Sequence, residues 1–331
     1  MYLIAEIGQA HEGSLGIAHS YIDALAKTGV NAVKFQTHIA EAESSIFENF
    51  RTNFSYEDKT RFDYWKRMEF NLEEWIGLKS HCDDLGLEFI SSPFSCAAVD
   101  LLEKVGVNKY KIGSGEISNR LMIDKIGSLN KDVILSSGLS SFNEIERAVN
   151  WLKLKGNNKV SILQCTTSYP TKPEEWGLNV IQDLKHKFKV PIGYSDHSGD
   201  INCGIAAYIL GAEIFEFHCI FDKEMFGPDS RSSLNLKEIK RLKKSIDILN
   251  LALNNPIDKS LKGDVTLKKI FGKSLCVNKK LKSGDIICYE DLESKKPAEK
   301  GISAESYQDV IGKKLLIDLN KWDFINQKDL I

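Results

Sequence analysis

Short apolar segments alternate with longer amphipathic segments from residue 2 to about residue 253. The apolar segments have strand length and predict eight β-strands, at residues 2–8, 32–38, 88–94, 109–115, 132–138, 160–166, 191–197 and 214–220. Strand–helix alternation predicts a parallel sheet, and eight such units predict closure into a (β/α)8 TIM barrel of the α/β class. The alternative is an open doubly wound sheet, which usually has fewer strands and a GxGxxG motif that this sequence lacks.

The first and last helical patterns have clear ends. Ser14 is a suitable N-cap for the first helix, and Gly29 stops it. Residues spaced three and four apart give each helix one apolar face, with Leu15, Ala18, Ile22 and Leu25 in the first and Ile239, Leu242, Ile246, Leu249 and Leu253 in the last.

One connection is unusually long. Residues 39–71 follow the second strand and are rich in Phe, Tyr and Arg. Loops of this length in a compact domain are usually functional or disordered, and the aromatic side chains favour an ordered lid or a partner surface.

The composition changes after Pro256, and we predict a barrel domain at 1–256, a linker at 257–271 and a small β-rich domain at 272–331. The small domain contains a duplication, because LKSGDIICYEDL (281–292) recurs as LNKWDFINQKDL (319–330). Two similar units related by a pseudo-twofold axis would make a core that is marginal alone, so we expect it to dock on something larger.

Bulk composition excludes several classes of protein. The 331 residues are 42% hydrophobic and 27% charged with a formal charge of -2, so the whole molecule does not attract nucleic acid or anionic membranes. The N-terminus has no signal-like leader, and no stretch approaches the roughly 20 apolar residues of a membrane span. The seven scattered cysteines fit free thiols, and we expect a cytoplasmic protein.

Polar residues gather where the predicted strands end, which is where TIM barrels carry their chemistry. A strand period of two directs these side chains inward, whereas Phe35, Phe215 and Phe217 face the helices. Charged side chains inside a barrel cost several kcal/mol unless they are paired or liganded, so their number indicates a site. The inward or strand-end set is Glu6, Lys34, Gln36, Ser92, Lys111, Ser114, Glu116, Ser136, Tyr169, Ser195, His197, Glu216 and His218.

His197 and His218 end neighbouring strands and form a candidate metal site. With Glu6, Glu216 and Asp229 available, two imidazoles could hold a divalent ion and leave positions open for water or substrate. The alternative for either histidine alone is a hydrogen-bonded core residue, but the pair at barrel-strand ends favours metal ligation.

Lys34 and Lys111 reach the same end of the barrel and form a candidate anion site. With hydroxyl groups and the backbone N–H groups of the turn at 113–115, they could bind a phosphate and a carboxylate. The alternatives are structural ion pairs with Glu6 or Glu116, and a Schiff-base role for one lysine, against which the histidine pair argues.

Taken together, the motifs resemble those of the bacterial sialic acid synthase family over nearly the whole chain, in the family's order and spacing. The motifs are IAEIG (4–8), VKFQTH (33–38), FISSPFS (89–95), KIGSGEISN (111–119), CTTSYPT (165–171), GYSDHS (193–198) and EFHCIFDK…GPD (216–229). The duplicated tail resembles the family's C-terminal antifreeze-like SAF domain.

The resemblance implies a transferase that condenses phosphoenolpyruvate (PEP) with an open-chain N-acyl amino sugar, such as N-acetylmannosamine, to give a nonulosonic acid for a surface polysaccharide. It implies Mn²⁺, replaceable by Mg²⁺ or Co²⁺, on His197 and His218. Glu6 or Glu116 would be the base. It also implies a domain-swapped homodimer. The PEP contacts would be Lys34, Ser92, Lys111, Ser114, Ser136, Tyr169 and Ser195, and the sugar contacts Gln36, Tyr169, Glu216, Asp229 and Lys296.

The sequence departs from the family pattern at several positions. Lys296 stands where the family has an arginine, which keeps the charge and loses the planar fork. Thr167 replaces an asparagine, and both the 39–71 insertion and residues 225–233 differ from those of the N-acetylneuraminate enzymes. These segments lie where the sugar should bind, so the resemblance leaves the sugar open.

Two other functions are compatible with parts of this pattern. A related PEP-dependent synthase would make a shorter ketoacid from a phosphorylated aldose, but it would need an arginine-rich pocket, and few arginines lie near these strand ends. A non-catalytic sugar-binding homologue is disfavoured because the lysines, histidines and Glu116 are all intact.

Overall fold

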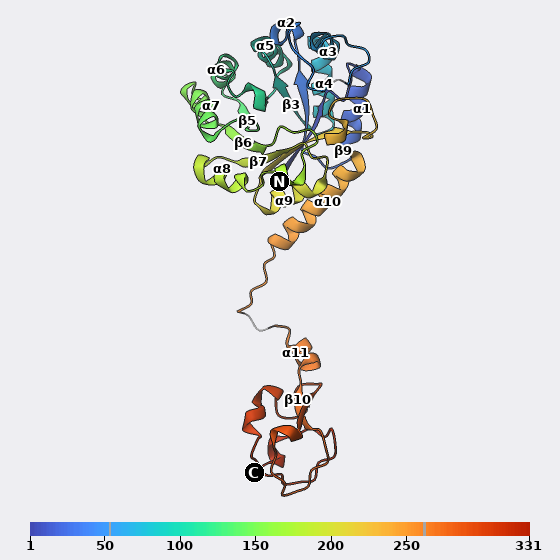
Figure 1. The fold of residues 1–331 in the computed structure, drawn as a ribbon, viewed down its shortest axis with the longest axis vertical. Coiled ribbons are helices and arrows are strands. Elements are labelled where there is room, and N and C mark those ends of the chain that lie inside the picture. Colours follow the sequence, from blue (N-terminus) through green and yellow to red (C-terminus); the bar gives the residue numbers. More distant parts are fainter. Residues whose placement is uncertain (53, 261–262) are drawn as a thin grey trace. The chain divides into compact units, whose positions relative to one another are not determined.

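The computed structural model describes all residues except 53, 261 and 262. Eight parallel strands form a closed barrel, because β1 pairs with both β2 and β8 (Figure 1). The predicted TIM barrel is therefore confirmed, and the open sheet is excluded. The strands are β1 Tyr2–Gly8, β2 Ala32–Thr37, β3 Glu88–Pro93, β4 Lys109–Ile112, β5 Asp132–Ser136, β6 Val160–Cys165, β7 Ile192–Asp196 and β8 Ile214–Ile220, with the short β9 Leu234–Asn235 beside β8.

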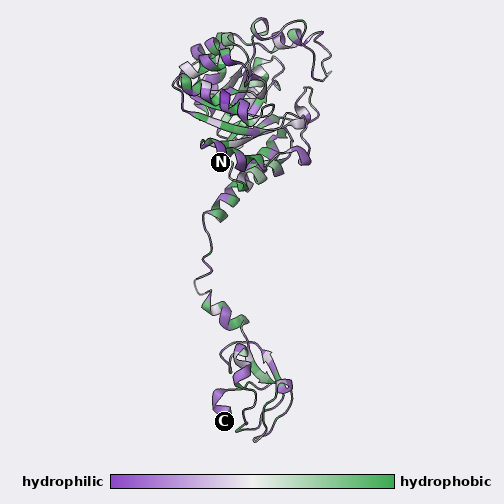
Figure 2. Cartoon of the chain, turned by 60° about the vertical axis from the view of Figure 1, so that its left-hand side comes forward, coloured by the Kyte–Doolittle hydropathy of each residue, from purple (hydrophilic) through white to green (hydrophobic). Residues whose placement is uncertain are grey.

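Helices surround the barrel and bury their apolar faces against it. Figure 2 shows hydrophobic residues gathered on the strands and mixed faces on the helices. Phe35, Phe215 and Phe217 are completely or almost completely buried on the helix side of the strands, as the period of two predicted. The helices around the barrel are α1 Leu15–Leu25, α4 Leu72–Asp84, α5 Cys96–Val105, α6 Arg120–Ser128, α7 Phe142–Leu154, α8 Val180–Phe188, α9 Ile201–Ile209 and α10 Leu236–Leu253.

The predicted N-cap of the first helix is confirmed, but the helix ends at Leu25, before the predicted stop at Gly29, and the predicted face of the last helix is partly wrong. The Ser14 side chain caps α1 by accepting a hydrogen bond from the N–H of Ile17. In α10 the buried face runs from Ile239 to Ile246, but Leu253 is 57% exposed, because apolar spacing alone does not say where the barrel surface ends.

An apolar layer fills the interior of the barrel below the polar strand ends. It consists of Ile4, Ala32, Ile90, Ile134 and Leu163, all 2% exposed or less. Register places Glu6 beside both Lys34 and His218, two residues beyond Ile4 on β1. Because inward residues recur every second position, the next layer up is the polar one.

The long insertion after β2 is ordered in its described residues. It contains α2 Ala40–Glu43 and α3 Arg61–Met68, and its aromatic side chains cluster around Tyr64 and Trp65. Arg67 ties it to the loop after β1 through Nη1, which lies 3.0 Å from Glu12 Oε2. Its Nη2 lies 2.8 Å from Asp58 Oδ2 within the insertion. The described part of the insertion is therefore ordered, and its role as a lid or as a partner surface remains a prediction.

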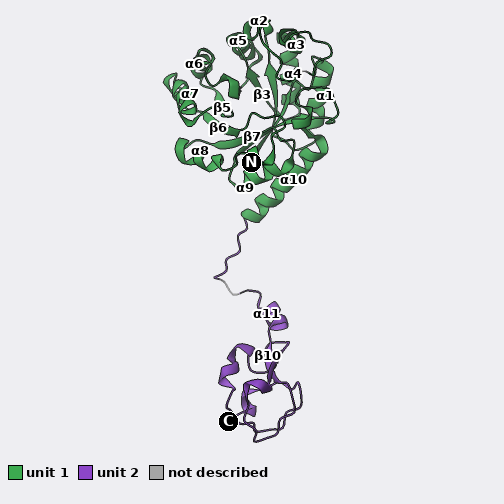
Figure 3. Cartoon of the chain, viewed as in Figure 1, with its two compact units in different colours: residues 1–254 green, residues 255–331 purple. Residues whose placement is uncertain are grey.

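The contacts divide the chain into two compact units, residues 1–254 and 255–331 (Figure 3). The second unit holds α11 Val265–Phe271 and the antiparallel pair β10 Ser274–Val277 and β11 Leu292–Lys295. No helix in the described part of either unit is long and apolar enough to cross a membrane.

The two copies of the duplication make equivalent contacts. Leu281 and Leu319 exchange backbone hydrogen bonds of 2.9 Å across the local symmetry. Gly284 and Trp322 occupy the same turn position and both have positive φ, +98° and +76°. A left-handed tryptophan costs about 1–2 kcal/mol relative to glycine, and the contacts of Trp322 do not explain why it stands there.

Candidate active site

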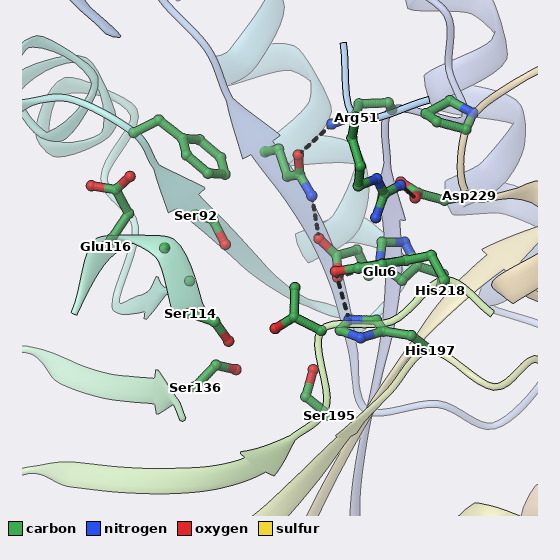
Figure 4. Close-up of a pocket in the computed structure, with 18 of the residues that line it drawn as sticks. Glu6, Arg51, Ser92, Ser114, Glu116, Ser136, Ser195, His197, His218 and Asp229 are labelled. Carbon is green, nitrogen blue, oxygen red and sulfur yellow. Dashed lines mark hydrogen bonds and ion pairs between the residues drawn. The ribbon is translucent and has the colours of Figure 1, made fainter. Parts of the chain in front are cut away.

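A cavity of about 340 Å³ opens at the carboxyl ends of the barrel strands. Figure 4 shows Glu6, His197 and His218 on one side, facing Ser92, Ser114, Ser136 and Glu116 across the opening. The structure brings every barrel residue of the sequence-predicted set into its lining: Glu6, Lys34, Gln36, Ser92, Lys111, Ser114, Glu116, Ser136, Tyr169, Ser195, His197, Glu216, His218 and Asp229.

Four buried charged side chains form the floor of this cavity. Lys34 Nζ lies 2.7 Å from Glu6 Oε1 and 3.6 Å from Glu216 Oε1. Lys111 Nζ lies 3.3 Å from the same Glu216 oxygen. All four side chains are 4% exposed or less, so each charge depends on its neighbours for solvation. The predicted alternative of a Lys34–Glu6 ion pair is present, and Lys111 pairs with Glu216 rather than with Glu116.

This network sets the protonation of its members. Burial raises the pKa of Glu6, but the charges of Lys34 and His218 outweigh it and hold the pKa below the usual glutamate range. Burial lowers the pKa of Lys34, and the two carboxylates reverse that shift and raise the pKa. Lys111 differs, because burial and the nearby Lys34 charge leave its pKa lowered. An anion that binds beside Lys111 would therefore stabilise its ammonium form.

Hydroxyl groups surround the two lysines. Lys111 Nζ donates to Ser136 Oγ at 2.6 Å and Lys34 Nζ to Ser92 Oγ at 3.3 Å. Ser195 Oγ donates to Glu216 Oε1 at 3.0 Å. Glu216 Oε2 is buried and has no hydrogen-bond partner among the described residues. Serine hydroxyls beside ammonium groups are suited to phosphate and carboxylate oxygens.

The two histidines lie side by side at the rim, with ring centroids 5.4 Å apart. His197 Nδ1 is 2.9 Å from the Thr166 carbonyl, so Nδ1 carries a proton and donates it there. This leaves Nε2 toward the cavity, 3.1 Å from Tyr169 Oη. His218 Nε2 lies 3.4 Å from Glu6 Oε2.

These residues fit two ligands of a divalent ion. The hydrogen bond from His197 Nδ1 to the Thr166 carbonyl oxygen leaves Nε2 unprotonated, as in histidines that bind a metal through Nε2. In the described parts of the chain no group of three His, Cys, Asp or Glu side chains converges for a metal, so the remaining positions would fall to water or substrate oxygen.

Glu116 is a carboxylate of a different kind. It belongs to the 3₁₀ turn Ser114–Glu116 that follows β4, and Asn119 Nδ2 donates to its Oε2 at 2.8 Å. Burial raises its pKa, and the Asn119 bond only partly offsets that shift. In Figure 4 it lies across the cavity from Glu6.

The sequence analysis missed the contribution of the insertion. Arg51 and Arg61 line the cavity together with the aromatic residues Phe54, Tyr64 and Trp65. The Arg51 guanidinium carbon is 3.8 Å from the centroid of the Tyr169 ring. The signal was present in the arginine and aromatic content of residues 47–65, but no spacing rule assigns such residues to a cavity. Cys165 was also missed, with Sγ 3.9 Å from His197 Nδ1.

Lys296 belongs to the second unit. Its Nζ lies 4.8 Å from the centroid of the Phe271 ring in the same unit. Its predicted contact with the sugar remains a prediction.

The NeuB family matches residues 21–258, well over half of the chain. The chain belongs to the NeuB family. It is 36% identical over 316 residues to N,N'-diacetyllegionaminic acid synthase from Campylobacter jejuni, covering 94% of both chains. It is 30% identical to human N-acetylneuraminate-9-phosphate synthase, covering 99% of this chain and 92% of the human one.

A solved structure gives the same result. The N-acetylneuraminic acid synthetase of Leptospira borgpetersenii, in complex with citrate, is 32% identical with a TM-score of 0.69 over 80% of this chain and 88% of that one. The predicted family and the prediction of a synthase enzyme that forms a carbon–carbon bond are confirmed. The names of these relatives differ in the sugar acid, so family membership does not fix the sugar.

The charge network generates a prediction for stability. Lys34→Met should lower the free energy of unfolding by about 3 kcal/mol at neutral pH, because it leaves buried carboxylates without their cation. In the wild type, the depressed pKa of Glu6 contributes stability that is lost as the pH falls through it. In the variant, burial without the Lys34 charge should raise the pKa of Glu6. The difference in the free energy of unfolding between wild type and variant should therefore become smaller as the pH falls and Glu6 protonates.

Urea unfolding of both proteins between about pH 5 and pH 8 measures this. Lys109→Met is the matched control, since Lys109 pairs with the partly exposed Glu88 at 3.0 Å. If Lys34→Met unfolds with the same free energy as the wild type, or if the difference between them is constant across the pH range, the proposed network would be contradicted.

Proposed function

We propose that this enzyme condenses PEP with an open-chain N-acyl amino sugar and releases inorganic phosphate. The observation that carries the proposal is the pair of buried lysines, Lys34 and Lys111, beside serine hydroxyls and two rim histidines in one cavity. PEP is a small molecule with a phosphate and a carboxylate, which match two ammonium groups that lie 3.6 and 3.3 Å from the same Glu216 oxygen. The NeuB match supports the reaction class.

The floor of the cavity would hold PEP. Lys34 and Lys111 would bind its anionic groups, and Ser92, Ser114, Ser136 and Ser195 would donate hydrogen bonds to its oxygens. Tyr169 would close this subsite from the side of the rim, where its hydroxyl meets His197. An anion bound next to Lys111 would raise the lowered pKa of this lysine, so that anion binding and the ammonium form favour each other.

The rim would hold the sugar. Gln36 and Asp229 would offer a donor and acceptors for hydroxyl groups, and Gln36 Nε2 already donates to Glu6 Oε1 at 2.7 Å. Glu216 lies on the floor and would offer its unpartnered Oε2 from below. A divalent ion on His197 and His218, such as Mn²⁺ with Mg²⁺ or Co²⁺ as substitutes, would polarise the sugar aldehyde.

The proposed reaction forms one carbon–carbon bond and breaks one carbon–oxygen bond. C3 of PEP attacks the aldehyde carbon, and the aldehyde oxygen gains a proton to become a hydroxyl group. Water adds to the resulting cation at C2, and a base takes one proton from that water, which balances the proton gained by the aldehyde oxygen. The bond between C2 and the phosphate oxygen then breaks while the new C2 hydroxyl loses its proton to the departing phosphate and becomes the keto group. Lys34 and Lys111 would stabilise the departing charge.

Glu116 is better suited than Glu6 to act as the base. The carboxylate of Glu6 is fixed by Lys34, and its lowered pKa makes it a weak proton acceptor. The raised pKa of Glu116 makes it a stronger acceptor near neutral pH. Glu6 would then position Lys34 and the His218 ring.

The rest of the assembly is proposed from the resemblance. We propose that the second unit is an antifreeze-like domain, that the enzyme is a cytoplasmic domain-swapped homodimer, and that Lys296 serves the sugar site. Exposed apolar side chains of the second unit, including Phe271 at 60% and Ile270 at 52%, are consistent with a surface that docks.

The direct test is phosphate release from PEP with a panel of N-acyl amino sugars. We expect turnover with at least one unphosphorylated sugar, loss of turnover with EDTA, and recovery with Mn²⁺. Turnover only with an aldose phosphate would instead indicate the shorter ketoacid synthase. Absence of turnover with every sugar would indicate a binding protein.

The role of Glu116 predicts a pH dependence. Because burial raises its pKa, the basic form is lost as the pH falls, and the acidic limb of kcat should lie above the usual glutamate range. Glu116→Gln should lower kcat by about 10²- to 10⁴-fold with little change in PEP affinity. Steady-state kinetics across pH with PEP titrations measure both. A variant with wild-type kcat would contradict this role and leave Glu6 as the base.

A further inference from the structure

Arg51 occupies an unusual position for a residue of a surface insertion. It follows α2 in the chain, yet its side chain reaches over the rim of the cavity (Figure 4). The guanidinium carbon lies 3.8 Å from the Tyr169 ring centroid, and Nη2 lies 2.8 Å from Asp229 Oδ1. These contacts come from the loops after β6 and β8, so Arg51 joins three segments that are distant in the sequence.

The contacts hold the guanidinium plane and leave most of its donors free. A guanidinium group has five N–H donors, and within the described residues Arg51 donates one hydrogen bond, to Asp229. Its side chain is 40% exposed and lines the cavity. Stacking on the Tyr169 ring fixes the plane of the guanidinium group. Its other N–H groups are therefore held in fixed directions and can donate to a ligand.

An apolar wall from the same insertion lines the same cavity. Phe54 and Tyr64 meet edge to face with centroids 5.1 Å apart, and Trp65 is 5.3 Å from Tyr64. A donor group and an aromatic wall in one pocket suit a ligand that joins a carbonyl acceptor to a small alkyl group. An N-acyl substituent has that structure.

The charges around Arg51 disfavour a phosphorylated ligand. Arg51 is already paired with Asp229, and Arg61 Nε lies 2.9 Å from Glu48 Oε1. Glu43 also lines the cavity and adds a further carboxylate. A phosphate dianion would have to displace these carboxylates or lie beside them, which like-charge repulsion opposes.

We propose that Arg51 is a specificity-determining residue that donates to the acyl carbonyl of an uncharged N-acyl amino sugar, while Asp229 and Glu48 keep phosphorylated sugars out. The proposal rests on the proposed function, since it concerns the acceptor of that same reaction. The hydrogen bond to the acyl carbonyl would thus come from the insertion at residues 39–71.

The test compares Arg51→Met and Arg51→Lys with the wild type, using N-acetylmannosamine and other N-acyl amino sugars that the wild type accepts. Hydrogen bonds from a charged donor predict a rise in the sugar KM of about 10- to 100-fold in Arg51→Met. The PEP KM should not change. Arg51→Lys keeps the charge and should recover only part of the loss. Arg147→Met, an exposed substitution on α7, should leave the kinetics unchanged.

Two further measurements separate the possible outcomes. The wild type should prefer N-acetylmannosamine to its 6-phosphate, and equal or better use of the phosphate would overturn the charge argument. A sugar KM that does not change in Arg51→Met, or a parallel rise in the PEP KM, would overturn the role of Arg51. In both cases an active wild type leaves the proposed function standing, whereas failure of that function appears as a wild type inactive with every sugar.

Discussion

The charge network of Lys34, Lys111, Glu6 and Glu216 is the constraint on which the active end of this barrel depends. These side chains are almost completely buried above an apolar layer, where an unpaired charge would cost several kcal/mol. The ion pairs offset this cost only in part. Glu216 contacts both lysines through Oε1, and its Oε2 has no hydrogen-bond partner among the described residues. The unpartnered oxygen can accept a hydrogen bond from a bound ligand, and an anion bound beside Lys111 would stabilise its ammonium form.

Much of the fold followed from the sequence, because inside-outside alternation and strand length are local properties. The eight strands were predicted within three residues of their observed ends. The largest differences are at β4 and β5, where the predicted strands run three and two residues too far. At β4 the chain turns at Gly113 into the 3₁₀ turn that holds Glu116. Glu116 lies on that turn and lines the cavity, whereas Lys111 pairs with Glu216.

The residues that sequence reasoning did not assign have a shared physical cause. Arg51 and Arg61 come from a segment without periodicity, and their positions depend on packing around Tyr64 and Trp65 rather than on any local rule. The strand-end residues alone contain few arginines, so the sequence predicted an arginine-poor pocket. Each of these arginines is paired with a carboxylate, Arg51 with Asp229 and Arg61 with Glu48. Counting arginines alone would have suggested a phosphate site, but the pairing argues against one.

Binding of PEP alone tests the central claim most directly, since it needs neither the sugar nor turnover. Isothermal titration of the wild type and Lys111→Met with PEP should show binding by the wild type and a loss of at least about tenfold in the variant, because a charge-assisted contact of about 1.5–3 kcal/mol is removed. Equal PEP affinity in the two proteins would contradict the assignment of the buried lysines to the anion site.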